Sequence, residues 1–139
     1  MIILLCGTSD IGRRMLAEKI VREHDTWKHL PLERVYELTQ KQNLQADEED
    51  PMFVRIACHC AKEMEEQGFH VVLSHPSGTE DIELMREELG PRFVGFHIGP
   101  VEGEASDDRV EELFDYLIDS SRHSVNDAYE LMMQVVDEA

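Results

Sequence analysis

The chain has 139 residues, which suits one domain with a sizeable core, and 42% of the residues are apolar. Thirty acidic residues against 13 lysines and arginines give a formal net charge of −17. That charge argues against nucleic acid as a partner, because phosphate backbones are bound by clustered cations. The leading apolar run is too short for a signal peptide or a membrane span, so we expect a cytoplasmic protein without a membrane partner.

The first segment predicts a buried strand, a glycine turn and a helix. The strand is Ile2–Cys6, the glycines follow with the spacing G-x-x-x-x-G, and apolar residues recur at helical spacing over residues 12–24. A glycine turn in this context is typical of a phosphate-binding loop, whose backbone amides surround the phosphate. We therefore expect these residues to bind phosphate or a nucleotide: Gly7, Thr8, Ser9, Asp10, Ile11, Gly12, Arg13 and Arg14.

The rest of the chain alternates short apolar strands with amphipathic helices. Further strands are predicted near residues 27–32, 69–73, 93–98 and 116–118, with helices between them and a last helix capped by residues 124–127. In that helix we expect Ala128, Leu131, Met132 and Val135 to face inward. This alternation predicts a single α/β domain over residues 1–139, with three layers and a mostly parallel five-stranded sheet. The leading strand should be central, in the order 2-3-1-4-5.

Ligands of such sheets bind beyond the carboxyl ends of the strands. His75 lies at one of these ends, which makes it a candidate for acid–base chemistry, with a packed structural histidine as the alternative. Cys6, Cys58 and Cys60 have neither disulfide-framework nor zinc-finger spacing. We expect buried free thiols and no metal site built from them.

Four stretches, taken in order, resemble the P-loop small-molecule kinases, most closely the adenylylsulfate kinases. They are residues 2–14, 43–62, 68–76 and 115–128. The third, G-F-H-V-V-L-S-H-P, is similar to the pattern G-x-x-V-x-x-S-x-x-S-P of that family, and D-Y-L-I-D-S-S in the fourth is similar to D-x-x-I-D-x-S. The resemblance implies a P-loop kinase fold, ATP and Mg²⁺ as cofactors, and phosphoryl transfer to a small hydroxyl substrate.

The resemblance also suggests roles for individual residues. Glu33 is the best match to the family's acidic residue that organises magnesium and the acceptor hydroxyl, and with His75 it forms our catalytic pair of candidates. On the substrate side we expect Arg34, Arg55, Ser74 and Pro76.

Two departures from the family pattern put the chemistry in doubt. Arg13 replaces the loop lysine, and Arg14 replaces the hydroxyl residue that holds magnesium. The family's arginine-bearing lid belongs in residues 99–114, but here that segment is short, has Arg109 as its one cation, and should form a loop and a two-turn helix. We expect a nucleotide or a phosphorylated small molecule as ligand, with impaired catalysis.

Three alternatives remain open. The glycines could merely shape a turn, with Arg14 paired to Glu18 or in solvent. The chain could be a non-catalytic regulatory or partner-binding protein that kept the scaffold, and a homodimer or protein partner fits either reading. A short-chain dehydrogenase turn is the third, but it needs three glycines and a Tyr followed four residues later by Lys; Gln40, Ser120 and Met133 stand at those positions.

Overall fold

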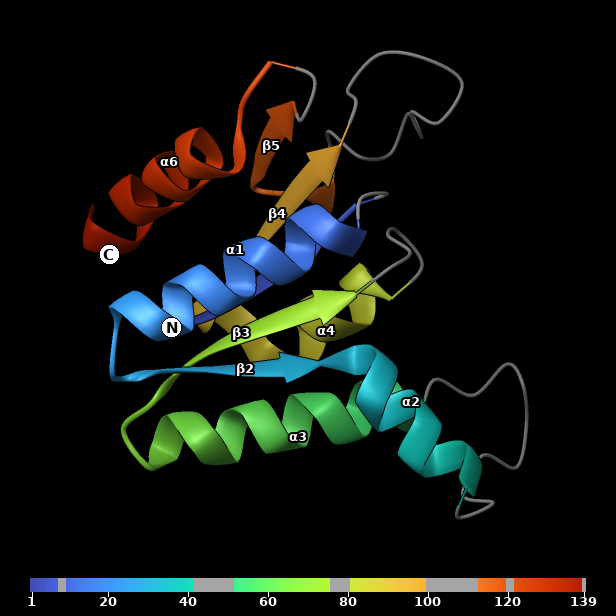
Figure 1. The fold of residues 1–139 in the computed structure, drawn as a ribbon. Helices are drawn as coiled ribbons and strands as arrows, with labels where there is room; N and C mark the ends of the chain where they lie inside the picture. Colours follow the sequence, from blue (N-terminus) through green and yellow to red (C-terminus); the bar gives the residue numbers. More distant parts are fainter. Residues whose placement is uncertain (8–9, 42–51, 76–80, 100–112, 120–121, 139) are drawn as a thin grey trace.

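The computed structural model describes residues 1–7, 10–41, 52–75, 81–99, 113–119 and 122–138. These residues form one sheet of five strands whose neighbours all run parallel, in the order β2-β3-β1-β4-β5 (Figure 1). The predicted sheet, its central leading strand and its strand order are confirmed. The strands are β1 (Ile2–Cys6), β2 (Trp27–Pro31), β3 (His70–His75), β4 (Phe93–Gly99) and β5 (Tyr116–Asp119).

Helices cover both faces of the sheet and complete three layers (Figure 1). One face packs against α1 and α6, and the other packs against α2, α3 and α4. A short 3-10 turn, η1, connects α4 to β4. The bounds are α1 (Asp10–Glu23), α2 (Leu32–Lys41), α3 (Met52–Glu66), α4 (Ile82–Leu89), η1 (Gly90–Arg92) and α6 (Val125–Glu138).

Strand β1 is buried on both faces, which explains why its sequence is continuously apolar instead of alternating. Ile2, Leu4 and Cys6 enter the core beneath α2, α3 and α4, while Ile3 and Leu5 enter the core beneath α1 and α6. All five are at most 1% exposed. Because the strand lies between two cores, its carboxyl end and the glycine turn that follows occupy a fixed place at the sheet edge.

Two side chains that we expected to be buried are exposed instead. Leu131 in α6 is 38% exposed, whereas Ala128 and Met132 on the side facing α1 are buried. In α3, Cys60 is exposed and Cys58 is buried. Both helices carry apolar residues at so many positions that periodicity alone does not fix the buried face.

The start of α6 has the predicted cap. The backbone N–H of Asp127 donates to Ser124 Oγ at 3.2 Å, and the N–H of Ser124 donates to Asp127 Oδ2 at 3.4 Å. The helix predicted within residues 99–114 lies outside the described residues, apart from Leu113 and Phe114, which are buried in the core with α4. Over the described ranges, none of the helices combines the length and hydropathy that crossing a membrane requires.

Candidate functional site

The turn after β1 requires glycine at its first position. Gly7 has φ +142°, a conformation that side chains other than glycine rarely adopt, and a Cβ placed there would lie 1.8 Å from the carbonyl oxygen of Ile98. The backbone therefore leaves β1 in close contact with the carboxyl end of β4. This close approach fixes the start of the predicted phosphate loop, whereas Thr8 and Ser9 lie outside the described residues.

The two arginines of the turn point in different directions. Arg13, in the first turn of α1, is 2% exposed, and its Nη1 donates a hydrogen bond to the carbonyl oxygen of Gly7. Arg14 is exposed. A guanidinium is thus buried beside the Gly7 carbonyl, at the position where the P-loop kinases that the sequence resembles carry lysine. Asp10 and Ile11 begin the same helix, and Gly12 is partly buried within it.

His75 contacts the carboxylate of Asp81, a partner that the sequence did not predict. Its Nε2 lies 2.9 Å from Oδ2 of Asp81, and the two side chains are 7% and 23% exposed. Asp81 is the N-cap residue of α4, yet its carboxylate makes no cap hydrogen bond. An Asp directly before an apolar helical run predicts a cap, and here the same residue contacts the histidine instead. The ring of Phe53 from α3 lies 6.1 Å from that of His75.

Cys6 lies between two histidines of neighbouring strands, His75 on β3 and His97 on β4. Burial raises the pKa of the Cys6 thiol to about 12, against the lowering effects of the Gly7 backbone hydrogen bond and the Arg13 charge. The thiol therefore stays protonated and is not a nucleophile at neutral pH. The charges of Arg13 and Asp81 both act on this thiol, so the loop cation and the His75–Asp81 contact belong to the same part of the edge.

Ser74 is occupied by a contact between strands. Its Oγ lies 2.8 Å from Nε2 of His29 on β2, and the serine is 4% exposed. Burial lowers the pKa of His29, although the nearby carboxylates of Glu33 and Glu18 oppose the shift. The Ser74 hydroxyl thus links β3 to the neighbouring strand β2. Pro76, the other substrate-side candidate of this stretch, lies outside the described residues.

The remaining candidates lie where two helices start. Glu33 and Arg34 are in the first turn of α2 and Arg55 is near the start of α3; both arginines are exposed. The two helix starts meet through an edge-to-face contact between Tyr36 and Phe53, whose ring centroids are 5.3 Å apart. The structure therefore gathers Glu33, Arg34 and Arg55 at the same sheet edge as His75.

The described residues fit a phosphate better than they fit magnesium. A loop-bound magnesium ion needs a hard oxygen ligand from the loop, and the corresponding residue is the exposed Arg14. Within the described ranges, no group of three or more His, Cys, Asp or Glu side chains could hold a metal ion. At position 14 the chain therefore lacks the hydroxyl with which the P-loop kinases that its sequence resembles hold magnesium.

Comparisons with known proteins give a fold. No family model matches the chain, and no curated protein matches its sequence significantly. The tunicamycin resistance protein of Deinococcus radiodurans superposes with a TM-score of 0.72 at 16% identity, over 97% of this chain and 94% of that one. A mutant APS kinase from Mycobacterium tuberculosis gives 0.70 at 14% identity, over 98% and 96%.

A gluconokinase from Sinorhizobium meliloti is similar with a TM-score of 0.60 at 11% identity, covering 92% of this chain and 86% of its own. At such identities the likeness concerns the backbone architecture, not the chemistry. The neighbours and the parallel sheet agree with the resemblance seen in the sequence. The chain has the fold of the P-loop small-molecule kinases.

Proposed function

We propose that the chain binds a nucleotide or a phosphorylated small molecule at the carboxyl edge of its sheet, and that phosphoryl transfer from ATP is impaired. The observation that supports this most is the placement of arginines at helix starts. In a chain with 13 lysines and arginines against 30 acidic residues, three helices of ten or more residues carry arginine within their first five residues at this edge. In the eight-residue α4, Arg86 belongs to the last turn and is not counted here. The residues are Arg13 and Arg14 of α1, Arg34 of α2 and Arg55 of α3.

A cation at a helix N-terminus opposes the helix dipole, at a cost of about 0.3–1 kcal/mol each. A bound anion reverses the sign of that interaction, because it is attracted both by the dipole and by the arginine. The Gly7 turn and Arg13 would hold one phosphate. A guanidinium has five N–H donors, so a hydrogen bond to the Gly7 carbonyl is compatible with a second one to a phosphate oxygen.

Arg34 and Arg55 would meet a second anionic group on the acceptor side. Glu33, in the first turn of α2, is the candidate for orienting an acceptor hydroxyl, and His75 is the second candidate for handling its proton. A small hydroxyl compound that carries its own anionic group is therefore the substrate class that this edge would favour.

The same arginines explain why turnover would be low. Phosphoryl transfer depends on positioning and on neutralising the charge of the transferred group. Arg13 supplies positive charge, but Arg14 removes the oxygen that would orient a metal ion. A non-catalytic regulatory protein that kept the scaffold is the alternative, and Arg14 is the residue that favours it.

Calorimetric titration of the whole chain with ATP, with magnesium or with a chelator, tests the proposal. Wild type should bind ATP with an affinity that changes little when magnesium is removed. The double change Arg13→Lys with Arg14→Ser restores an ammonium and a hydroxyl, and should make binding depend on magnesium. The control Arg22→Ser removes one positive charge from the last turn of α1 and should change neither result.

Two outcomes would contradict the proposal. If wild type binds neither ATP nor inorganic phosphate at millimolar concentration, the edge is not an anion site and the scaffold alternative gains support. If wild type binds ATP tightly with magnesium and Arg14→Ser abolishes that binding, Arg14 is a working ligand-binding residue and catalysis is not impaired for the reason given.

A further inference from the structure

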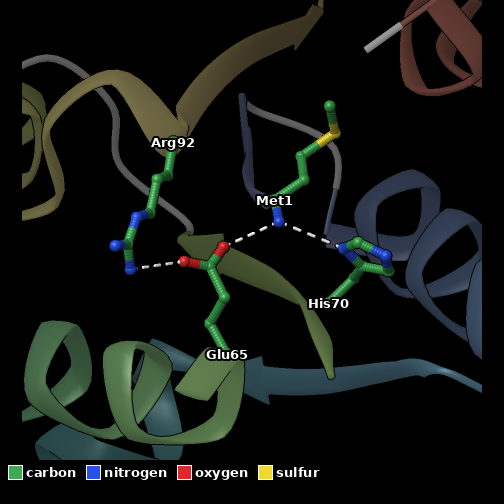
Figure 2. Close-up of polar contacts among 4 residues, drawn as sticks. All are labelled: Met1, Glu65, His70 and Arg92. Carbon is green, nitrogen blue, oxygen red and sulfur yellow. Dashed lines mark hydrogen bonds and ion pairs between the residues drawn. The ribbon is translucent and has the colours of Figure 1, made fainter. Parts of the chain in front are cut away.

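The amino edge of the sheet, opposite the proposed ligand site, holds a polar cluster around the first nitrogen of the chain (Figure 2). The ammonium of Met1 donates to Oε2 of Glu65 at 2.7 Å and lies 3.1 Å from Nδ1 of His70. Arg92 donates from Nη1 to the other oxygen of Glu65 at 2.8 Å. The side chains of Met1 and Glu65 are each 14% exposed. The residue before β1 and the 3-10 turn η1 thus meet at a carboxylate of α3, and β3 adds His70 beside the ammonium.

Glu65 has an otherwise unfavourable position. It lies in the last turn of α3, where the negative end of the helix dipole repels a carboxylate. Burial would raise its pKa, but hydrogen bonds and charges from the Met1 ammonium and from Arg92 hold the pKa below its ordinary value. The carboxylate is therefore kept at this place by its two cationic partners.

His70 completes the surroundings of the ammonium. The distance of 3.1 Å assigns Nδ1 as the acceptor, so the ring is neutral and carries its proton on Nε2. The ring stacks on Trp27, with centroids 4.9 Å apart, which fixes its orientation. Burial, followed by the charge of the ammonium, lowers the pKa of His70. A carboxylate and a neutral imidazole nitrogen are the partners that suit a primary ammonium, which has several N–H donors and one positive charge.

We propose that Glu65 and His70 form a built site for the α-ammonium of Met1, and that acylating or extending this nitrogen weakens the fold. Acetylation by an acetyl thioester forms a C–N bond, breaks the C–S bond of the donor and removes two protons from the ammonium, one to the released thiol and one to solvent. The product has a single N–H and no charge. It cannot serve Glu65 and His70 together, and it leaves Glu65 with Arg92 as its remaining partner in this cluster.

A double-mutant cycle on the whole chain tests this coupling. Urea unfolding at pH 7 would compare free and Nα-acetylated chains, each in wild type and in Glu65→Gln, with mass spectrometry to confirm the acetyl group. In wild type, acetylation should lower the equilibrium constant for folding about tenfold, as expected for lost hydrogen bonds to charged groups. In Glu65→Gln it should lower the constant less than about threefold, because the charged partner is already gone. One glycine added before Met1 should act like the acetyl group.

Glu66→Gln is the matched control, because Glu66 is an exposed carboxylate in the same last turn of α3. Acetylation should destabilise this variant as much as wild type. The proposal is overturned if acetylation has no effect on wild type, or if its effect is the same in wild type and in Glu65→Gln. Every measurement here is a folding equilibrium without ligand. The result therefore does not depend on which ligand, if any, binds at the carboxyl edge.

Discussion

At the amino edge of the sheet one carboxylate, Glu65, is in contact with two cations, whereas at the carboxyl edge arginines stand at the starts of three helices. The first arrangement pairs charges of opposite sign within the chain. The second places cations where the helix dipoles oppose them. Paired charges contribute to folding, and cations at helix starts are the feature on which we base the proposed anionic ligand. The comparison therefore separates a structural edge from a candidate ligand edge.

Strand β3 carries this contrast along its own length. His70 at its first position meets the ammonium of Met1 at 3.1 Å, and His75 at its last position meets the carboxylate of Asp81 at 2.9 Å. The histidine at the start of β3 therefore has a cationic neighbour, and the histidine at its end has an anionic neighbour. Sequence position alone does not distinguish them, but the surrounding elements do.

The largest expected loss of stability comes from substituting Gly7 at the carboxyl edge, with Gly68 at the amino edge as the comparison. Gly7→Ala should cost more than about 4 kcal/mol or prevent folding, because the new Cβ would overlap the Ile98 carbonyl at 1.8 Å in addition to the backbone strain at φ +142°. Gly68→Ala, at φ +95° with nothing within 4 Å, should cost about 1–2 kcal/mol from strain alone. Urea unfolding of both variants measures the difference. Equal losses would mean that the close approach of the turn to β4 is not rigid.

A smaller loss is expected when the His75 contact is removed. Asp81→Ala should cost about 1–2 kcal/mol, the range for a hydrogen bond that involves a charged group. Asp81→Asn keeps an acceptor oxygen without the charge and should cost about half as much. Urea midpoints of both variants measure this. If the two substitutions cost the same, the charge of Asp81 does not contribute to the contact.

Acid should act first on three partly buried histidines. Burial lowers the pKa of His29, His70 and His97 below the ordinary 6.5, so between that value and the folded-state values the unfolded chain binds more protons. The free energy of unfolding should therefore fall as the pH drops below 6.5. Glu65, whose pKa is held below 4.5, should add a second loss in more acidic solution.

Urea midpoints between pH 7 and pH 5 measure this dependence. His70→Gln should reduce the slope, because one of the three groups no longer titrates. An unchanged slope in His70→Gln would show that the Met1 ammonium does not hinder protonation at the amino edge.

The smallest effect is expected for Arg92→Met. Arg92 is 59% exposed, and solvent screens its contact with Glu65, so the loss should be about 0.5 kcal/mol or less. Lys62→Met, which removes the surface ion pair with Glu88 at 3.6 Å, is the control and should also cost little. If Arg92→Met costs as much as blocking the Met1 nitrogen, the arginine is as strong a partner of Glu65 as the ammonium.

The backbone architecture was predictable because its signals are local. A continuously apolar first strand indicates burial on both faces, and right-handed crossovers then restrict the strand order. The polar contacts were not predictable in the same way. Met1 and Glu65 are 64 residues apart in the chain, and His29 and Ser74 are 45 apart, so their pairing follows from strand order and register.

The candidate edge was predictable in place but not in detail. Gly7 and Arg13 were expected in a phosphate loop, and the structure puts them in contact; the direction of the guanidinium toward the Gly7 carbonyl depends on how α1 leaves the turn. Asp81 was missed because an Asp near a helix start gives no local sign of a contact with a histidine six residues earlier. Roles for Glu33, Arg34 and Arg55 stay predictions.

The burial of the thiols has a consequence for labelling chemistry. Burial raises the pKa of both Cys6 and Cys58 to about 12, whereas Cys60 is exposed. A thiol-specific reagent at neutral pH will therefore modify Cys60 directly, and the other two only when the surrounding structure opens. Cys6 at the end of the central strand and Cys58 in the middle of α3 lie in different elements. The modification rate of Cys6 therefore reports opening around β1, and that of Cys58 reports opening around α3.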